Sequence, residues 1–297
     1  MSLIEIIEVS PRDGLQNEKV VVSTDDKVRL IEEVIAAGAK RIEAVSFVHP
    51  RLVPTMADAE AVMARVPRGN GVRYIGLALN ERGVKRAVDA GGDEINFVLP
   101  VTDKFAAANQ NTSVKALVNA LERSAPYAVD ANIRLTVTLA VAFGCPYQGE
   151  VTTEEVGQVA LAALNAAPLD ELALADTIGS GVPGQTRRLI RHVRELTDIP
   201  LRGHFHETRH TAIANATAAI EEGMYRLDSS VGGLGGCPFA PGAAGNVSTE
   251  DLVWALERDG HTTTVSSSSA AEIGRWISGI VGGTPRSGLA TAGVFPA

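Results

Sequence analysis

The stretch DIPLRGHFHETRH, residues 198–210, contains two overlapping patterns that require different backbones. His204 and His206 form H-x-H, which places two imidazoles on one face of a strand. His206 and His210 bound an H-E-x-x-H pattern, which binds zinc in metalloproteases only when it lies on a helix. Pro200 and Gly203 oppose a helix across the first half of the stretch, so we expect an extended backbone there. The sequence therefore favours H-x-H on a strand and disfavours a zinc protease.

The histidine pair itself admits two interpretations. Two imidazoles at the end of a strand can bind one metal ion side by side, or they can form a hydrogen-bonded pair in the core. We favour the metal site, because a matched pair at a strand end is less typical of core packing than a lone histidine. His49, His192 and His261 have no partner at this spacing and are expected at the surface or in loops.

Strand-like and helix-like runs alternate on both sides of this stretch. The expected strands are 4–9, 41–47, 73–79, 94–100, 134–143, 171–176, 201–207 and 226–233. The expected helices are 25–38, 56–66, 81–91, 112–129, 152–167, 184–197, 209–222, 248–258 and 269–281. Strands that are each followed by a helix predict an α/β fold, a TIM (β/α)8 barrel with extra C-terminal helices, in a single domain over 1–297. The alternative, a doubly wound sheet, is disfavoured because no G-x-G-x-x-G follows the first strand.

A TIM barrel carries its chemistry at the carboxyl ends of its strands, and the reactive residue types follow that rule. Those residues are Arg12 and Asp13 after the first expected strand, Glu43 on the second, Asp176 at the end of the sixth, His204 and His206 on the seventh, and Cys237 and Asn246 after the eighth. An aspartate and an asparagine oxygen beside two imidazoles would make a mixed nitrogen and oxygen shell. Such a shell suits Mg²⁺ or Mn²⁺ and also allows Zn²⁺ or Co²⁺.

Composition narrows the class of protein. The net charge of −8 over 297 residues and the lack of a basic tract argue against nucleic acid as a partner. No apolar run reaches the roughly 18–20 residues of a membrane helix, and the N-terminus does not read as a signal peptide. The two cysteines, Cys145 and Cys237, cannot build a disulfide framework and fit a reducing cytoplasm. We expect a cytoplasmic protein without a membrane partner.

Six segments together resemble the 3-hydroxy-3-methylglutaryl-CoA lyase family, within the TIM-barrel metal-dependent lyases and Claisen synthases. They are EVSPRDGLQNE (8–18), IEAVSFVHPRLVPTMADAE (42–60), GCPYQGEV (144–151), ADTIGSGVPG (175–184), GHFHETR (203–209) and SVGGLGGCPFAPGAAGN (230–246). The segments occur in family order, and the resemblance extends over nearly the whole chain.

The resemblance implies a role for each candidate residue. Asp13, His204, His206 and Asn246 would bind the divalent cation, Mg²⁺ or Mn²⁺. Arg12 would contact the thioester carbonyl, and Cys237, on a mobile loop, would take part in proton transfer. Glu43 and Asp176 would be catalytic or supporting acids, and Gln16 would contact the cofactor. The implied reaction is metal-dependent retro-Claisen cleavage of a 3-hydroxy-3-methylglutaryl-CoA-type thioester to acetyl-CoA and acetoacetate, with CoA as part of the substrate. The proton of the C3 hydroxyl would go to Asp13 or Glu43. A homodimer and a place in leucine degradation are expected by resemblance only.

Two departures from the family pattern leave alternatives open. The family has Asp at the position of Glu207 and Gly at the position of His210, which either lines the acyl pocket or faces solvent. A lyase of the family for another 3-hydroxyacyl-CoA, or a related aldolase or Claisen synthase, is the alternative function. Cys237 could instead be a small buried hydrophobe and Asn246 a helix cap, while Cys145 is expected to be structural.

Overall fold

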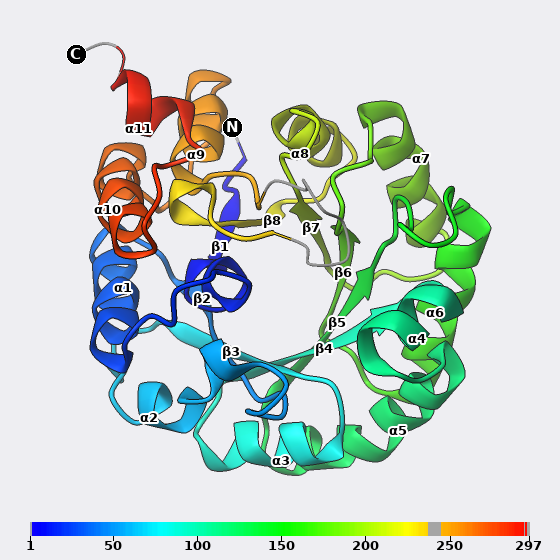
Figure 1. The fold of residues 1–297 in the computed structure, drawn as a ribbon. Coiled ribbons are helices and arrows are strands. Elements are labelled where there is room, and N and C mark those ends of the chain that lie inside the picture. The colour runs from blue at the N-terminus through cyan, green and yellow to red at the C-terminus, as the bar shows by residue number, and fades with distance from the viewer. Residues whose placement is uncertain (1, 237–244, 294, 296–297) are drawn as a thin grey trace.

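The computed structural model describes residues 2–236, 245–293 and 295. In these ranges eight parallel strands pair in chain order and close into a barrel (Figure 1), which confirms the predicted TIM barrel. The strands are β1 (Glu5–Glu8), β2 (Arg41–Ser46), β3 (Arg73–Ala78), β4 (Glu94–Pro100), β5 (Arg134–Ala140), β6 (Glu171–Asp176), β7 (Leu201–Phe205) and β8 (Arg226–Ser229). The single-domain assignment of 1–297 stays a prediction.

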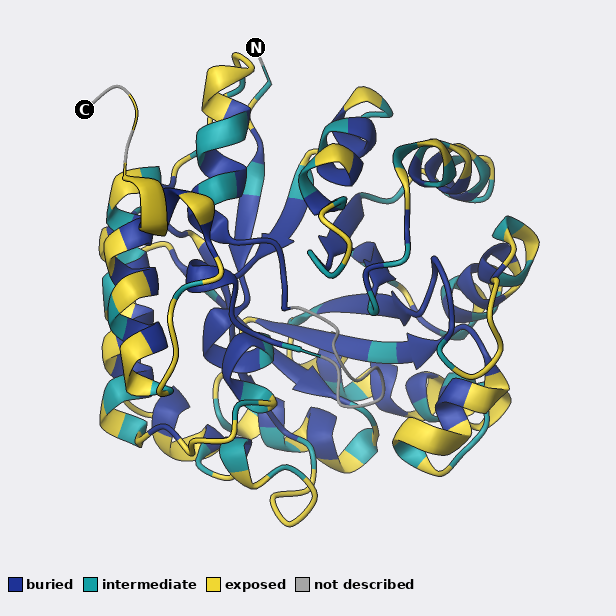
Figure 2. Cartoon of the chain, turned by 45° about the horizontal axis from the view of Figure 1, so that its top comes forward, coloured by how far each residue is buried: buried dark blue, intermediate teal, exposed yellow. Residues whose placement is uncertain are grey.

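Helices surround the barrel and expose their outer faces, while the strands are buried (Figure 2). The helices are α1 (Thr24–Ala36), α2 (Ala59–Met63), α3 (Glu81–Asp89), α4 (Asp103–Gln110), α5 (Val114–Asp130), α6 (Thr153–Ala166), α7 (Pro183–Arg194), α8 (Ala212–Glu221), α9 (Thr249–Arg258), α10 (Ser267–Ile280) and α11 (Gly288–Ala292). Side-chain caps fix where many of them begin. At α6, for example, the Glu155 amide donates to Thr152 Oγ1 over 3.2 Å, and the Thr152 amide donates to Glu155 Oε2 over 2.8 Å.

The sequence placed the strands well and several connections poorly. The expected helix 56–66 is a 3₁₀ turn, η2 (Pro54–Met56), followed by the short α2. The expected strands 134–143 and 226–233 end early: Val141 leaves the extended region with φ +56°, and residues 231–233 form a 3₁₀ turn in which Gly232 has φ +70°. Helix α4, the short α11 and a π-helical turn after β1, η1 (Ser10–Gly14), were not expected.

Charged side chains fill the amino-terminal end of the barrel, where aliphatic residues are usual. The first residues of the four even-numbered strands form a layer, here called the ion layer: Arg41, Glu94, Glu171 and Arg226. Arg41 Nη2 lies 2.5 Å from Glu94 Oε1 and 2.6 Å from Glu171 Oε1, and Arg226 Nη1 lies 3.3 Å from Glu171 Oε2. Two cations and two anions balance each other, which is the condition for burying charge.

Two buried carboxylates hold the turn that follows β8. The amide of Gly232, in the 3₁₀ turn η3 (Val231–Gly233), lies 3.1 Å from both carboxylate oxygens of Glu250. The neighbouring amide of Val231 donates to Glu8 Oε1 over 3.2 Å. Burial raises the pKa of both acids, and it raises the pKa of Glu250 to about 7.

Among the described helices, none combines the length and the apolarity that crossing a bilayer requires.

Replacing Arg41 with Met should lower the free energy of unfolding by about 3–5 kcal/mol, because it leaves buried carboxylates without their shared cation. Denaturant unfolding measures this. Arg65→Met is the matched control: its pair with Asp25 is exposed and should contribute less than about 1 kcal/mol. Equal losses in the two variants would show that the ion layer does not stabilise the barrel.

Replacing Glu250 with Gln should remove a decline of stability with pH. The pKa of Glu250 is about 7 in the fold and near 4.5 in the unfolded chain, so the native state holds the extra proton. The stability tied to that proton is complete below the unfolded pKa and is lost as pH rises through about 7. Over this pH range the free energy of unfolding of the wild type should therefore fall by on the order of 3 kcal/mol, whereas that of the variant should not.

Urea unfolding across this pH window, with the exposed Glu272→Gln as control, measures the difference. Parallel pH profiles for wild type and Glu250→Gln would contradict the prediction.

Candidate functional site

The π-helical turn η1 presents Arg12 and Asp13 at the carboxyl end of the barrel. Arg12 Nε donates to Glu43 Oε2 over 2.7 Å, and Arg12 Nη1 lies 2.6 Å from Asp13 Oδ1. Burial opposes the charge of Arg12, but Glu43 and Asp13 outweigh it and raise the pKa of the guanidinium. The cation is therefore fixed at the mouth of the barrel, between two carboxylates.

The two histidines lie where the strand interpretation put them. His204 belongs to β7, and His206 follows it with an extended backbone that forms a bridge with Asn246. The Nε2 atoms of His204 and His206 lie 3.1 Å apart. One ligand atom from each of Asp13, His204 and His206 lies within 4.8 Å of the others. H-x-H is confirmed as the arrangement of the backbone, and the helical H-E-x-x-H pattern is absent at these described residues.

Asn246 completes this cluster from the segment before α9. Its Nδ2 donates to Asp13 Oδ2 over 2.8 Å and to the Leu234 carbonyl over 3.2 Å. Its Oδ1 is buried and accepts no hydrogen bond from any residue that the structure describes. Gly235, with φ +121°, allows the approach, because a Cβ there would lie 2.8 Å from Asn246 Nδ2. Ser248, not Asn246, caps α9.

These donors fit a divalent cation. Two imidazole nitrogens and a carboxylate oxygen lie within 4.8 Å of one another, and the Asn246 amide, whose oxygen accepts no hydrogen bond from a described residue, contacts that carboxylate. Burial raises the pKa of Asp13, but Arg12 and the histidines outweigh it and hold the pKa of the carboxyl well below its usual range. Asp13 is therefore an anion, as a carboxyl group that ligates a cation must be.

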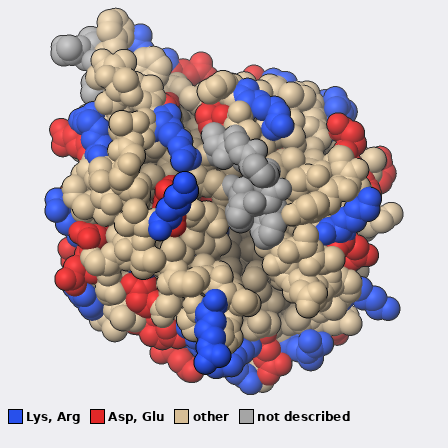
Figure 3. Space-filling model, in the orientation of Figure 1, with Lys and Arg blue, Asp and Glu red and all other residues tan. Residues whose placement is uncertain are grey.

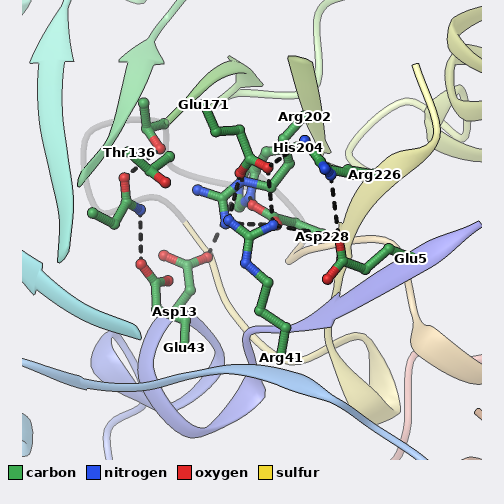
Figure 4. A network of polar contacts seen from close by, with 12 residues as sticks. Glu5, Asp13, Arg41, Glu43, Thr136, Glu171, Arg202, His204, Arg226 and Asp228 are labelled. Atoms are coloured by element: carbon green, nitrogen blue, oxygen red, sulfur yellow. Dashed lines mark hydrogen bonds and ion pairs between the residues drawn. The ribbon is translucent and has the colours of Figure 1, made fainter. Parts of the chain in front are cut away.

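Three polar residues that support the cluster escaped the sequence reading. Asp228 of β8 places Oδ2 3.0 Å from His204 Nδ1 (Figure 4). Asn96 Nδ2 donates to Glu43 Oε1 over 2.8 Å, and Thr138 Oγ1 donates to Asn96 Oδ1 over 2.7 Å. Their signal was present: each is a buried polar side chain in a barrel strand, two residues after another polar or charged one.

The Asp176 carboxylate is occupied by its own loop. It ends β6, is fully buried, and accepts from the amides of Ser180 over 2.8 Å and Gly181 over 3.0 Å. Burial raises its pKa. The described contacts thus tie Asp176 to the loop between β6 and α7 and not to the Asp13 cluster.

The remaining candidates are placed less closely. Gln16 is half-buried after η1, and its side-chain oxygen accepts no hydrogen bond from a described residue. Cys237 lies outside the described residues, so its role stays a prediction. Cys145 is buried and lies 3.1 Å from Thr102 Oγ1, in agreement with a structural role.

The two departures from the family pattern differ in their surroundings. His210 has φ +56°, a left-handed backbone that favours glycine, and its side chain is 91% exposed. Of the two interpretations of His210, the structure agrees with the one in which it faces solvent. Glu207 is half-buried, and burial raises its pKa.

Comparison with known proteins extends over nearly the whole chain. The model of the HMGL-like family matches residues 3–277. Hydroxymethylglutaryl-CoA lyase of Pseudomonas mevalonii is 41% identical and is covered over 98% of each chain. A Pseudomonas aeruginosa protein named 3-hydroxy-3-isohexenylglutaryl-CoA/hydroxy-methylglutaryl-CoA lyase is 39% identical over 94% of this chain and 93% of that one.

A solved structure has the same fold. The HMG-CoA lyase from Acinetobacter baumannii, in complex with coenzyme A and 3-methylmalate, superposes with a TM-score of 0.94 at 38% identity. The match covers 99% of this chain and 96% of that one. The resemblance read from the six segments is thereby confirmed, and the chain belongs to the HMGL-like family.

Proposed function

We propose that this chain, a carbon–carbon lyase by family, cleaves 3-hydroxy-3-methylglutaryl-CoA to acetyl-CoA and acetoacetate with the help of a divalent cation. One observation carries the proposal: Arg12 is fixed beside the four donors Asp13, His204, His206 and Asn246 at one end of the barrel. A retro-Claisen cleavage needs this combination, since it develops charge at two oxygens of the substrate.

The four donors are proposed to hold Mg²⁺ or Mn²⁺, which suit a mixed nitrogen and oxygen shell. When bound, the cation supplies Lewis acidity at the C3 hydroxyl and lowers the pKa of that group. Asp13 serves as a ligand better than as a base, because its pKa is held low. Of the two candidate bases this leaves Glu43, which lies against Arg12 at the same opening.

Arg12 is proposed to stabilise the thioester enolate as the carbon–carbon bond breaks. A guanidinium stays charged throughout and donates in a fixed plane, which suits an oxygen that gains negative charge. Asn96 and Thr138 fix Glu43, and Glu43 in turn fixes the plane of Arg12. The donor is therefore oriented before the substrate arrives, which is where such stabilisation gains its strength.

The other candidate residues keep narrower proposed roles. Cys237 would return a proton to the acetyl-CoA carbanion, as the family resemblance implies. Asp176 would shape the opening through its loop. Gln16 would contact the CoA part of the substrate. The phosphates of CoA need cationic side chains as partners. Lys and Arg side chains lie around the rim of the face that carries a central hollow (Figure 3).

The proposal includes the setting expected from the sequence. We propose a homodimer and a place in leucine degradation on the family resemblance. We propose a cytoplasmic location because the low cysteine content fits a reducing compartment. Sedimentation of the purified chain would test the dimer separately from the reaction.

The decisive assay incubates metal-stripped protein with 3-hydroxy-3-methylglutaryl-CoA, with and without Mg²⁺ or Mn²⁺, and follows acetyl-CoA. We expect release only with added metal, and none from Cys237→Ala. Acetyl-CoA release without added metal would contradict the metal-dependent mechanism. If folded, metal-bound protein released no acetyl-CoA, the proposed substrate would be wrong.

Replacing Arg12 with Gln should lower kcat by about 10²- to 10³-fold, because one donor to the developing oxyanion is lost. The same acetyl-CoA assay measures it. Arg123→Gln, an exposed change on α5, is the control and should retain full activity. A normal kcat for Arg12→Gln would exclude Arg12 from the stabilisation of the transition state.

A second candidate substrate is a thioester of the same type with a longer acyl group. It is favoured by the relative from Pseudomonas aeruginosa, whose printed name includes an isohexenylglutaryl-CoA. Comparing kcat/KM for the methyl and isohexenyl substrates decides between them.

The His210→Gly variant should keep the acyl preference of the wild type, because the side chain is 91% exposed. It should also gain stability of up to about 1 kcal/mol, since glycine adopts the left-handed backbone without strain. Kinetics with both thioesters and denaturant unfolding measure the two effects. A changed preference would return His210 to the acyl pocket.

A further inference from the structure

Arg202 and Asp228 lie between the ion layer and the candidate metal ligands (Figure 4). Arg202 is fully buried on β7, with Nε 3.2 Å from Glu171 Oε1 and Nη1 3.4 Å from Asp228 Oδ1. Asp228 Oδ2 lies 3.0 Å from His204 Nδ1. These three contacts, here called the charge chain, connect one end of the barrel interior to an imidazole at the other.

The contact with Asp228 selects the tautomer of His204. A carboxylate can only accept, so His204 Nδ1 carries the hydrogen and donates it. The lone pair then sits on Nε2, which lies 3.1 Å from the Nε2 of His206. An imidazole that donates one nitrogen to a carboxylate presents the other nitrogen to a metal in a fixed direction.

Arg202 is what balances Asp228. The guanidinium makes no hydrogen bond to another described residue, and Asp228 Oδ1 accepts none. Arg202 thus acts as a buried charge between two carboxylates. Without it, Asp228 would be a buried anion held by its single contact with His204, with Arg12 as the remaining cation that acts on it by charge.

We propose that Arg202 and Asp228 are positioning residues that set the affinity of the metal site through His204. The inference rests on the metal site of the proposed function, but not on the identity of the acyl group. It adds two residues that touch neither the substrate nor the cation. Asp228 holds the imidazole, and Arg202 holds Asp228.

The test measures Mn²⁺ binding to the full chain without substrate, by calorimetry and by the electron paramagnetic resonance signal of free Mn²⁺. Arg202→Met and Asp228→Asn should each raise the Kd for Mn²⁺ by about 10- to 100-fold. Arg226→Met is the matched control. Arg226 contacts Glu171, as Arg202 does, but has no described contact with Asp228, so its Kd should stay within about 3-fold of the wild type.

A double variant separates a positional effect from general damage. If Arg202 acts through Asp228, Arg202→Met should cost little further affinity once Asp228→Asn is present. Arg202→Lys, which keeps a cation there, should recover most of the affinity. Asp228→Asn has nearly the shape of the wild type and keeps the test valid if Arg202→Met fails to fold.

Each other outcome overturns one statement. A wild type that binds no Mn²⁺ would remove the metal site and with it the proposed function. Normal Mn²⁺ binding by both wild type and Asp228→Asn would refute the positioning role alone. An equal loss in Arg226→Met would assign the effect to the ion layer as a whole.

Discussion

The barrel depends on the pairing of charges that it buries. Arg41 is 1% exposed and lies against Glu94 and Glu171, so the interior is neutral only if strands from distant parts of the chain meet in one register. A shift of one residue would turn these side chains to the other face of their strands. The ion layer therefore fixes the register of the strands, whereas aliphatic packing makes the barrel compact. A wrong register would leave buried charges unpaired, which costs more free energy than misplaced apolar side chains do.

The candidate site uses the same polar interior at its other end. Asp228, Asn96 and Thr138 rise from strands whose first residues are charged. Asp228 and Asn96 each hold a residue at the opening, and Thr138 holds Asn96. Backbone irregularities complete the arrangement. The π-helical turn η1 directs Arg12 and Asp13 into the opening, and such turns are frequent at functional sites.

The sequence revealed the strands and the residues at their ends, because hydrophobic periodicity and strand termini are local properties. His204 and His206 could be placed on an extended backbone from Pro200 and Gly203 alone. Contacts across the barrel could not be read in this way. Asp228 and Arg202 have meaning only once β7 and β8 are adjacent, and α4 buries little beyond Phe105 and Ala106, so its pattern was too weak to detect. The family resemblance assigned roles to residues at the strand ends, which periodicity could not do, and its assignment of Cys237 lies outside the described residues.

Asn246 donates to Asp13 across 233 residues of chain, so the ligand cluster straddles the seam where β8 meets β1. During synthesis on the ribosome, a growing chain therefore offers Asp13 almost at once and the amide oxygen only after most of the barrel has been made. A cation that required all four donors would bind last and would act as a check that the circle of strands had closed. Because Asp13 and Asn246 lie near opposite ends of the chain, metal binding by all four donors has to follow synthesis of nearly the whole barrel.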